Sequence, residues 1–436
     1  MQVISPWEAA RSGEPETEVP TQTEFAGRRA RLFWLALRMG LLTVLTLGFY
    51  RFWMKTRLRR WYWSAWRPSG HPLEYVGDPW EKLLGFLIAV VFLAFYIGIV
   101  NLLLMFLSFS LFNGNFAAYL LSFLGVIPLW FYARYRARRY VLARTRWRGV
   151  RFGLEPGAWG FAVRALWHWF LTIITLGVLW PRKAFYLEKY ITDRTYFGAQ
   201  KLTQNGSWFG LLRPWVGVWL PVLASGFAFG VLGYEGYQAM QNFDWVLEDN
   251  PTPPETSALW QALVLAAPIV AFIAPIWLLL ALVNYNVKRV RYLTSHKSAG
   301  DASLDIKPRF WKVTGIYFWG YSFAGLVGAL ILTPIIVIMV LVFESDGMAA
   351  MGLESGTVET LPQPVLTAIA IASYFLLFLM WSVLMHTFIR FPMMRHFASS
   401  LTIINLGELA NVSQRPRDEF GEAEGFAEAL DVGAAI

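Results

Sequence analysis

Six long apolar stretches constrain this chain more than any other feature of its sequence. Each approaches or exceeds the roughly 20 mostly apolar residues that an α-helix needs to cross a bilayer, and none contains Asp or Glu. Charged residues make up only 15% of the 436 residues, against roughly 25% in a soluble domain, which is too few to cover a globule of this size. The chain is therefore predicted to be an α-helical polytopic membrane protein. The predicted spans are 83–107, 116–133, 211–233, 259–284, 313–343 and 363–389.

The loops between these stretches alternate between basic and acidic or neutral. The loops 54–82, 134–158, 181–213 and 285–312 contain six, eight, six and seven Lys or Arg residues, whereas 108–115, 234–258 and 344–362 contain none. Because basic loops stay on the cytoplasmic side, this pattern predicts that the four basic loops and both termini lie in the cytoplasm.

Two further apolar segments, 32–53 and 159–180, have basic residues on both flanks. An ordinary span would place one of these flanks outside, against the usual charge distribution. The favoured interpretation is that each segment enters and leaves on the cytoplasmic side as a re-entrant or interfacial helix pair. Gly48 and Gly177 are the candidate hinges or re-entrant turns, and ordinary spans are the alternative. Three transmembrane hairpins then remain, at 83–133, 211–284 and 313–389.

A parallel internal repeat joins these features. Leu42 to Gly48 matches Leu171 to Gly177 at an offset of 129 residues, and the first predicted hairpin shifted by this offset falls on the second. The predicted organisation is a disordered N-terminal tail at 1–24, a first repeat at 25–157, a second repeat at 158–306, a third transmembrane hairpin with a last β-hairpin at 307–412, and an acidic C-terminal tail at 413–436.

A shorter pattern follows each return to the cytoplasmic side. An aromatic residue precedes a Gly by eight or nine residues, in the pairs Tyr62 and Gly70, Tyr140 and Gly149, Tyr190 and Gly198, and Tyr292 and Gly300; a last copy runs from His396 to Asn405. β-Branched and aromatic residues around a Gly turn predict short cytoplasmic β-hairpins, which on one side of the membrane can pair into a sheet. The alternative is five unrelated basic loops.

The first of these copies carries a family resemblance. The residues concerned are Phe25-Ala26-Gly27, Leu42 to Lys55, Arg59-Arg60-Trp61-Tyr62, Gly70-His71, Glu74-Tyr75 and Pro79-Trp80. Over residues 25–85 the chain resembles the YjgN-like family of bacterial inner-membrane proteins, a domain of unknown function, and it matches in pattern to about residue 405. Met54 and the shorter Pro181-Arg182-Lys183 run depart from the family motif. The resemblance implies an integral inner-membrane protein and no particular activity.

Three cationic or titratable side chains lie within apolar segments and are the candidate intramembrane polar residues. They are Arg38 in the first segment and Arg164 and His168 in the second. Arg164 and His168 are four residues apart, and Arg38 shifted by 129 falls beside His168. Charged groups in a membrane are expensive, so these residues are a functional hypothesis: facing a central cavity, they would favour an anionic solute. The favoured interpretation is that they lie at the interface and extend to lipid phosphates.

Small residues at four-residue spacing mark the candidate helix-packing positions. They are Gly226, Gly230, Gly320, Ala324 and Gly328. Packing within one chain is favoured over an oligomer interface, and the sequence does not define an oligomeric state.

Catalytic and metal-binding patterns are not found. The chain has no Cys, its five His residues are isolated, and the common nucleotide-binding, hydrolase and metalloprotease motifs are absent. We therefore expect no enzyme activity, no metal and no cofactor. The basic clusters alternate with aromatic residues beside span ends, which predicts anionic lipid headgroups of the bilayer, and not nucleic acid, as partners.

Two functions remain open from the sequence. The first is a transporter or channel for a small, anionic solute, which the parallel repeats and the intramembrane cations favour. The second is a non-transporting membrane scaffold or lipid-interacting protein with a cytoplasmic interaction surface. The hairpin array and the lack of acidic residues in the spans favour this second function.

Overall fold

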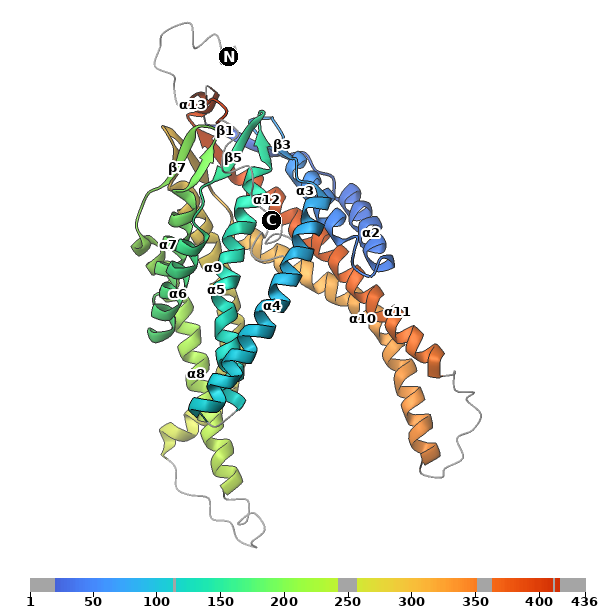
Figure 1. Cartoon of the computed structure of the whole chain (residues 1–436). Helices are drawn as coiled ribbons and strands as arrows, with labels where there is room; N and C mark the ends of the chain where they lie inside the picture. Colours follow the sequence, from blue (N-terminus) through green and yellow to red (C-terminus); the bar gives the residue numbers. More distant parts are fainter. Residues whose placement is uncertain (1–19, 113–114, 242–256, 351–362, 411, 416–436) are drawn as a thin grey trace.

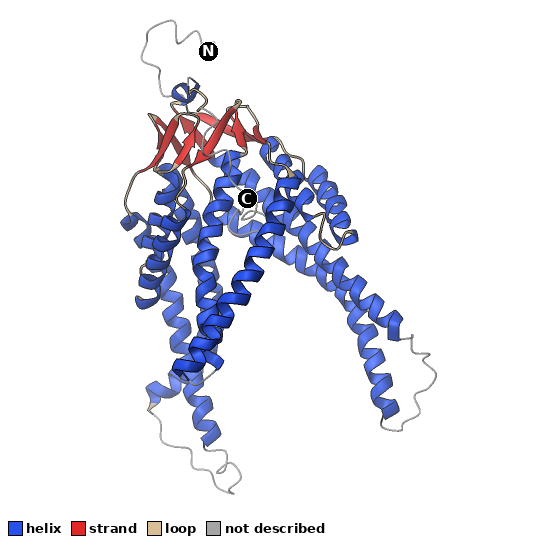
Figure 2. Ribbon diagram, viewed as in Figure 1, coloured by secondary structure: helices blue, strands red, loops and turns tan. Residues whose placement is uncertain are grey.

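The computed structural model describes residues 20–112, 115–241, 257–350, 363–410 and 412–415. Within these residues, long helices project from a ten-stranded antiparallel sheet, so that the strands gather at one end of the molecule (Figure 2). The described part of the chain therefore has two regions, a small sheet and a larger set of helices.

The strands are short and the helices are long. The strands are β1 (Thr21–Phe25), β2 (Trp66–Pro68), β3 (Leu73–Tyr75), β4 (Thr145–Trp147), β5 (Val150–Leu154), β6 (Thr195–Phe197), β7 (Gln200–Gln204), β8 (Lys297–Ala299), β9 (Ala302–Ile306) and β10 (Leu401–Ile404). The helices are α2 (Arg29–Leu45), α3 (Arg51–Ala65), α4 (Pro79–Phe112), α5 (Asn115–Ala143), α6 (Ala158–Ile174), α7 (Trp180–Thr192), the 3-10 helix η1 (Trp208–Leu211), α8 (Leu212–Gln241), α9 (Ala258–Ser295), α10 (Phe310–Ala350), α11 (Gln363–Leu384), the π-helix η3 (Met385–Arg390), α12 (Phe391–Ser400) and α13 (Leu406–Ala410).

The sheet nearly closes into a barrel. Its strand order is β2-β1-β10-β9-β8-β7-β6-β5-β4-β3, with pairs such as Thr23↔Pro68 between β1 and β2 and Leu73↔Trp147 between β3 and β4. The two outermost strands, β2 and β3, are consecutive in the chain, and in the turn between them the His71 N–H donates to the Pro68 carbonyl at 3.1 Å. The two ends of the sheet are thus held together by a four-residue turn.

Every second connection around the barrel is a helical hairpin. The hairpin α2/α3 joins β1 to β2, α4/α5 joins β3 to β4, α6/α7 joins β5 to β6, α8/α9 joins β7 to β8, and α10 to α12 joins β9 to β10. The other connections are tight turns. All helical hairpins therefore leave one end of the barrel, here called the helix end, and the turns lie at the opposite turn end.

The strands form because their side chains alternate between two environments. In β4, Thr145 and Trp147 are buried on either side of the more exposed Arg146, and β6 repeats this pattern with Thr195 and Phe197 buried. The four predicted turn glycines have positive φ and separate consecutive strands; they are Gly70, Gly149, Gly198 and Gly300.

The predicted fold class is wrong. The sequence predicted a helical membrane domain with short cytoplasmic β-hairpins that can pair into a sheet, whereas the strands, together with β1 and β10, form one continuous and nearly closed barrel-like sheet. The physical reason is that a two-stranded hairpin leaves unpaired N–H and C=O groups along both edges. Pairing with strands of the neighbouring hairpins satisfies these groups everywhere except at the outer edges of β2 and β3.

The hairpins α2/α3 and α6/α7 turn through the same backbone conformation. Gly48 has a φ of +95° and Gly177 a φ of +92°, values that favour glycine. Their N–H groups donate back to the carbonyls of Thr43 and Thr172 at 2.7 and 2.6 Å. Each of the segments 32–53 and 159–180 is therefore one helix followed by a tight turn at the glycine, and the next helix begins at the end of the segment.

Five helices among the described residues are long and apolar enough to cross a membrane. They cover Pro79–Leu107, Trp208–Met240, Ala258–Ser295, Phe310–Pro334 and Ile371–Ser400. The sixth predicted span, 116–133, lies in α5, whose first residues have side chains outside the described set. Away from the sheet, the hairpin α10/α11 diverges from the helices α4, α5, α8 and α9 (Figure 1).

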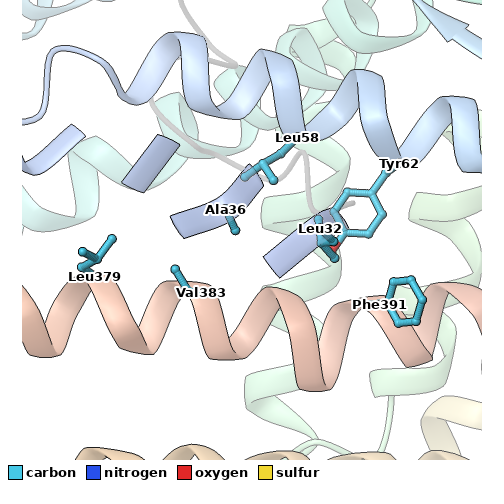
Figure 3. Packing of buried hydrophobic residues seen from close by; sticks show 7 residues of the cluster. All are labelled: Leu32, Ala36, Leu58, Tyr62, Leu379, Val383 and Phe391. Carbon is cyan, nitrogen blue, oxygen red and sulfur yellow. The ribbon is translucent and has the colours of Figure 1, made fainter. Parts of the chain in front are cut away.

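A buried apolar cluster joins the first hairpin to the last. Leu32 and Ala36 of α2 and Leu58 and Tyr62 of α3 pack against residues that follow more than 300 positions later in the chain (Figure 3). The later residues are Leu379, Val383 and Phe391. This contact brings β1 and β10 together, as the closure of the barrel requires.

The predicted terminal tails include residues that belong to the sheet or contact it. Thr21–Phe25 form β1 and pair with β2 and β10, although residues 1–24 were expected to be disordered. Ser413 also contacts the sheet, because its carbonyl accepts the Ala199 N–H at 3.0 Å. Residues 1–19 and 416–436, and most of the acidic loops 234–258 and 344–362, lie outside the described residues.

Candidate functional site

A buried lysine at the helix end of the barrel is the centre of the candidate site. The Nζ atom of Lys183 lies 3.1 Å from the ring centroid of Trp180 and 3.4 Å from that of Trp169. The residue is 5% exposed, and its Nζ has no hydrogen-bond partner among the described residues. The two indole faces attract the ammonium group, but they provide no acceptor for its three N–H donors.

Local sequence explains how the lysine reaches this position. The turn at Gly177 places α6 and α7 side by side, and Pro181 occupies the first turn of α7, where a missing N–H costs little. Trp169 and Trp180 meet edge to face with ring centroids 5.5 Å apart. Trp180 also stacks on Trp215 of α8 at 5.8 Å, which fixes one wall of the lysine site.

Other cations surround Lys183. Burial, together with the positive charges of Arg134 on α5 and Arg289 on α9, lowers the pKa of Lys183 to about 7. Both arginines come from helices other than α7. The lysine is therefore held in a place where its own positive charge is unfavourable.

One carboxylate faces this positive charge. Glu188 of α7 forms an ion pair with Lys297 of β8. The positive charge of Lys297 lowers the pKa of Glu188 to about 2 against the opposing effect of burial, and Arg138 and Arg289 act in the same direction as Lys297. We call these six residues the basic cluster: Arg134, Arg138, Lys183, Glu188, Arg289 and Lys297.

The basic cluster has the chemistry of an anion-binding site. Its five cationic side chains outnumber its one carboxylate. Arg134 and Arg138 are exposed, so a ligand from outside can contact the cluster next to the buried Lys183. Guanidinium groups bind phosphate oxygens through paired N–H donors, and lysine adds a point charge. Basic pockets between membrane helices commonly hold lipid headgroups.

The structure places the predicted intramembrane residues elsewhere. Arg38 is exposed on α2, and Arg164 is exposed on α6, where its Nη1 donates to the Gly160 carbonyl at 3.0 Å. His168 is buried and stacks on Tyr186 with ring centroids 5.4 Å apart. Because α2 and α6 lie on opposite sides of the molecule (Figure 1), Arg38 is not brought next to Arg164 or His168.

The two groups of candidate packing residues differ. Gly226 and Gly230 are exposed on α8, and a Cβ added at either would meet nothing within 4 Å. On α10, a Cβ at Gly320 would lie 2.5 Å from Ile389 Cγ1, and Ala324 is 0% exposed. A Cβ at Gly328 would lie 3.8 Å from Leu377 Cδ1. The α10 positions therefore face the last hairpin, and the α8 positions face outward.

The sequence analysis did not single out Lys183 as a site residue. A usable signal was present, because Lys55 and Lys183 follow the turn glycines Gly48 and Gly177 at similar distances. The partners Arg134 and Arg289 are separated by more than 150 residues, and no spacing rule joins them. Only the packing of α5, α7 and α9 brings the cluster together.

The comparisons with known proteins give a family without an activity. A family described as "Bacterial protein of unknown function (DUF898)" matches residues 20–319, which include the whole basic cluster. The chain belongs to this family. No curated protein and no solved structure matches this DUF898 member. The expectation of a bacterial family of unknown function is confirmed.

Proposed function

We propose that this DUF898 protein is an integral protein of the bacterial inner membrane that binds anionic lipid headgroups through the basic cluster. The observation that carries the proposal is Lys183, a buried cation with no hydrogen-bond acceptor among the described residues and with further positive charges around it. An anion bound there supplies the missing acceptor and neutralises the repulsion between Lys183 and Arg134.

The charge distribution supports a cytoplasmic sheet. The barrel is built from the basic loops, and the described termini, β1 and residues 412–415, both lie at the sheet. Basic segments favour the cytoplasmic side, where the leaflet carries anionic lipid. The sheet and the basic cluster then lie at the depth of the cytoplasmic headgroups.

The arrangement of the spans supports lipid contact more than transport. Only 7% to 22% of each span is buried within the chain, and α10/α11 diverges from the other long helices (Figure 1). A single copy therefore presents its apolar faces outward, to lipid. The candidate cations of the transport hypothesis, Arg38 and Arg164, are exposed and lie on separate helices. Of the two functions open from the sequence, we adopt the lipid-interacting one.

Two finer assignments belong to the same proposal. The motif over residues 25–85 supports a place in the YjgN-like branch of bacterial inner-membrane proteins. The matching turns at Gly48 and Gly177 support a parallel repeat of the two helical hairpins. We propose neither an enzymatic activity nor a nucleic-acid partner.

The experiment measures lipid binding to the full chain in neutral detergent, by native mass spectrometry and by thermal stabilisation. Phosphatidylglycerol is compared with phosphatidylcholine, and Arg134→Ala/Arg138→Ala is compared with the natural chain. At about 1 kcal/mol per cation near a headgroup, we expect the double variant to bind phosphatidylglycerol about thirtyfold more weakly. Phosphatidylcholine binding is expected to be unchanged.

The control removes the same number of charges elsewhere. Arg309→Ala/Lys312→Ala replaces two exposed cations at the sheet end of α10 that lie outside the basic cluster. This variant is expected to retain nearly all binding of phosphatidylglycerol. Equal losses in the two double variants would show that general surface charge, and not the basic cluster, attracts the lipid.

A further inference from the structure

The barrel contains a half-open cavity that its own side chains leave unfilled. Its volume is about 270 Å³. Its walls come from the inward-facing side chains of strands β2 to β10 and are almost entirely apolar. Principal lining residues are Trp147, Phe152, Phe197, Leu202, Leu304 and Ile403. The cavity lies in the sheet and is distinct from the basic cluster, with Lys297 at the boundary between them.

Residue size explains why the cavity remains open. Eight strands give an interior that side chains can just fill, and a ten-stranded barrel is wider. The aromatic residues Trp147, Phe152 and Phe197 pack together, with ring centroids 4.9 to 5.5 Å apart. Strands β8 and β9 instead contribute the small residues Ala299 and Ala302, which pair with each other across the ladder.

The size and polarity of the cavity define its ligand. An apolar cavity of about 150 Å³ holds a six-carbon ring, so 270 Å³ corresponds to roughly ten carbon atoms. The lining residue Trp147 also carries an unsatisfied donor, because its Nε1 is buried and has no hydrogen-bond partner among the described residues. A buried N–H without an acceptor is unfavourable, and a ligand oxygen would satisfy it.

A segment near the C-terminus covers the turn end of the cavity. Leu409 of α13, the helix that follows β10, lines the cavity. Residues 412–415, farther along the chain, contact a different part of the barrel. The Ser413 carbonyl accepts the Ala199 N–H at 3.0 Å, and Gln414 Oε1 accepts the Arg151 N–H at 2.9 Å. A ligand that enters from the turn end must displace these contacts.

We propose that the barrel cavity binds the hydrocarbon chain of a free fatty acid of about ten carbons, with α13 and residues 412–415 as its lid. The apolar wall takes the chain, and a carboxyl oxygen accepts from Trp147 Nε1. The spans place this cavity beside a bilayer, which is the source of such chains. Binding here does not depend on Arg134 or Arg138 of the basic cluster.

The experiment uses the full chain in nanodiscs and a ten-carbon fatty acid that carries a photoreactive diazirine. After illumination, mass spectrometry identifies the labelled peptides. We expect labels on β5, β7 and β9, and a loss of at least tenfold in this labelling when unlabelled decanoate is added in excess. A phospholipid with the same diazirine chain is tested in parallel. If it labels the strands equally, the cavity binds bilayer lipid, and the proposal of a free fatty acid is overturned.

Cavity-filling variants test the location. Ala302→Phe is expected to fill the space and to reduce labelling of the strands at least tenfold, and Ala302→Leu to reduce it less. Thr402→Phe is the control, because it adds the same bulk at a β10 residue that does not line the cavity. In Arg134→Ala/Arg138→Ala, the diazirine fatty acid is expected to label the strands as in the natural chain, even if this variant no longer binds phosphatidylglycerol. Labelling confined to the long helices in the natural chain would refute the cavity site without any variant.

The absence of cysteine allows the lid to be tested directly. Ala199→Cys/Ser413→Cys places two thiols on neighbouring backbone positions of the closed lid. Oxidation is expected to slow labelling at least tenfold, and reduction is expected to restore it. Equal labelling rates of the oxidised and reduced forms would show that the fatty acid enters by another route.

Discussion

Replacement of Lys183 by Met is the sharpest test of the candidate site. The pKa of Lys183 falls from 10.5 to about 7, chiefly because the side chain is buried. At 1.36 kcal/mol per pKa unit, its charged form is disfavoured in the folded protein by roughly 5 kcal/mol. Contact with the two indole faces offsets about 2 kcal/mol. Lys183→Met keeps the apolar length of the side chain and is expected to stabilise the protein by about 3 kcal/mol at pH 7.

The stability difference between Lys183→Met and the natural chain is expected to depend on pH in one direction. Below pH 7 the lysine is protonated in both folded and unfolded chains, and the cost of burying its charge is fully present. Between pH 7 and about 10.5 the unfolded chain binds more protons, so stability rises by about 1.4 kcal/mol per pH unit. The advantage of Lys183→Met over the natural chain is therefore expected to shrink, and then to disappear, between pH 7 and pH 9.5.

The assay is reversible unfolding in mixed micelles, followed by circular dichroism at pH 7.0, 8.0 and 9.5 as denaturant is added. Lys312→Met is the control, because Lys312 is an exposed lysine outside the basic cluster, and we expect little change with it. A Lys183→Met protein that is less stable than the natural chain at pH 7 would refute the reasoning. A stability difference that stays constant with pH would also refute it.

The remaining predictions use the same unfolding assay. Gly177→Ala is expected to cost about 1 to 2 kcal/mol, because φ is +92° there, whereas Gly226→Ala in the middle of α8 should be neutral or stabilising; equal effects would contradict the turn geometry. The pKa of Glu188 lies at about 2, so the free energy of unfolding of the natural chain should fall by roughly 3 kcal/mol between pH 5 and pH 2. Glu188→Gln leaves Lys297 unpaired and should not show this acid-dependent fall. Ala324→Phe at a fully buried position of α10 is expected to cost about 1 to 3 kcal/mol, and an unchanged stability would show that this face is loosely packed.

Several structural features were readable from local sequence. The apolar stretches predict long helices because roughly 20 apolar residues in a row are favourable in the core of a bilayer, where the backbone must be helical. Among the described residues, five of the six stretches lie in helices that are long and apolar enough to span a membrane. The Gly-centred turns at Gly149 and Gly300 join consecutive strands, as their β-branched and aromatic surroundings predicted. Each of these features depends on a few neighbouring residues.

The features that sequence reasoning missed depend on residues far apart in the chain. The short predicted hairpins are parts of one nearly closed barrel, because a strand at the edge of one hairpin pairs with a strand of the next, such as β5 with β6 across the helices α6 and α7. The structure keeps two of the candidate cations apart for a related reason. Arg38 and Arg164 occupy similar places in their helices, but the barrel sends those two helices to opposite sides of the molecule (Figure 1).

By itself, the sequence determined the membrane class of this DUF898 protein, the positions of its turns and the distribution of its charge. These properties follow from hydrophobicity, backbone preference and charge, which act over one helix or one turn. Tertiary structure alone decided that ten short strands nearly close around an apolar cavity and that Lys183 is buried between two indoles beside Arg134 and Arg289. Both outcomes arise from the same cause: a circular sheet brings consecutive hairpins together at one end, and only there do distant side chains share an interior.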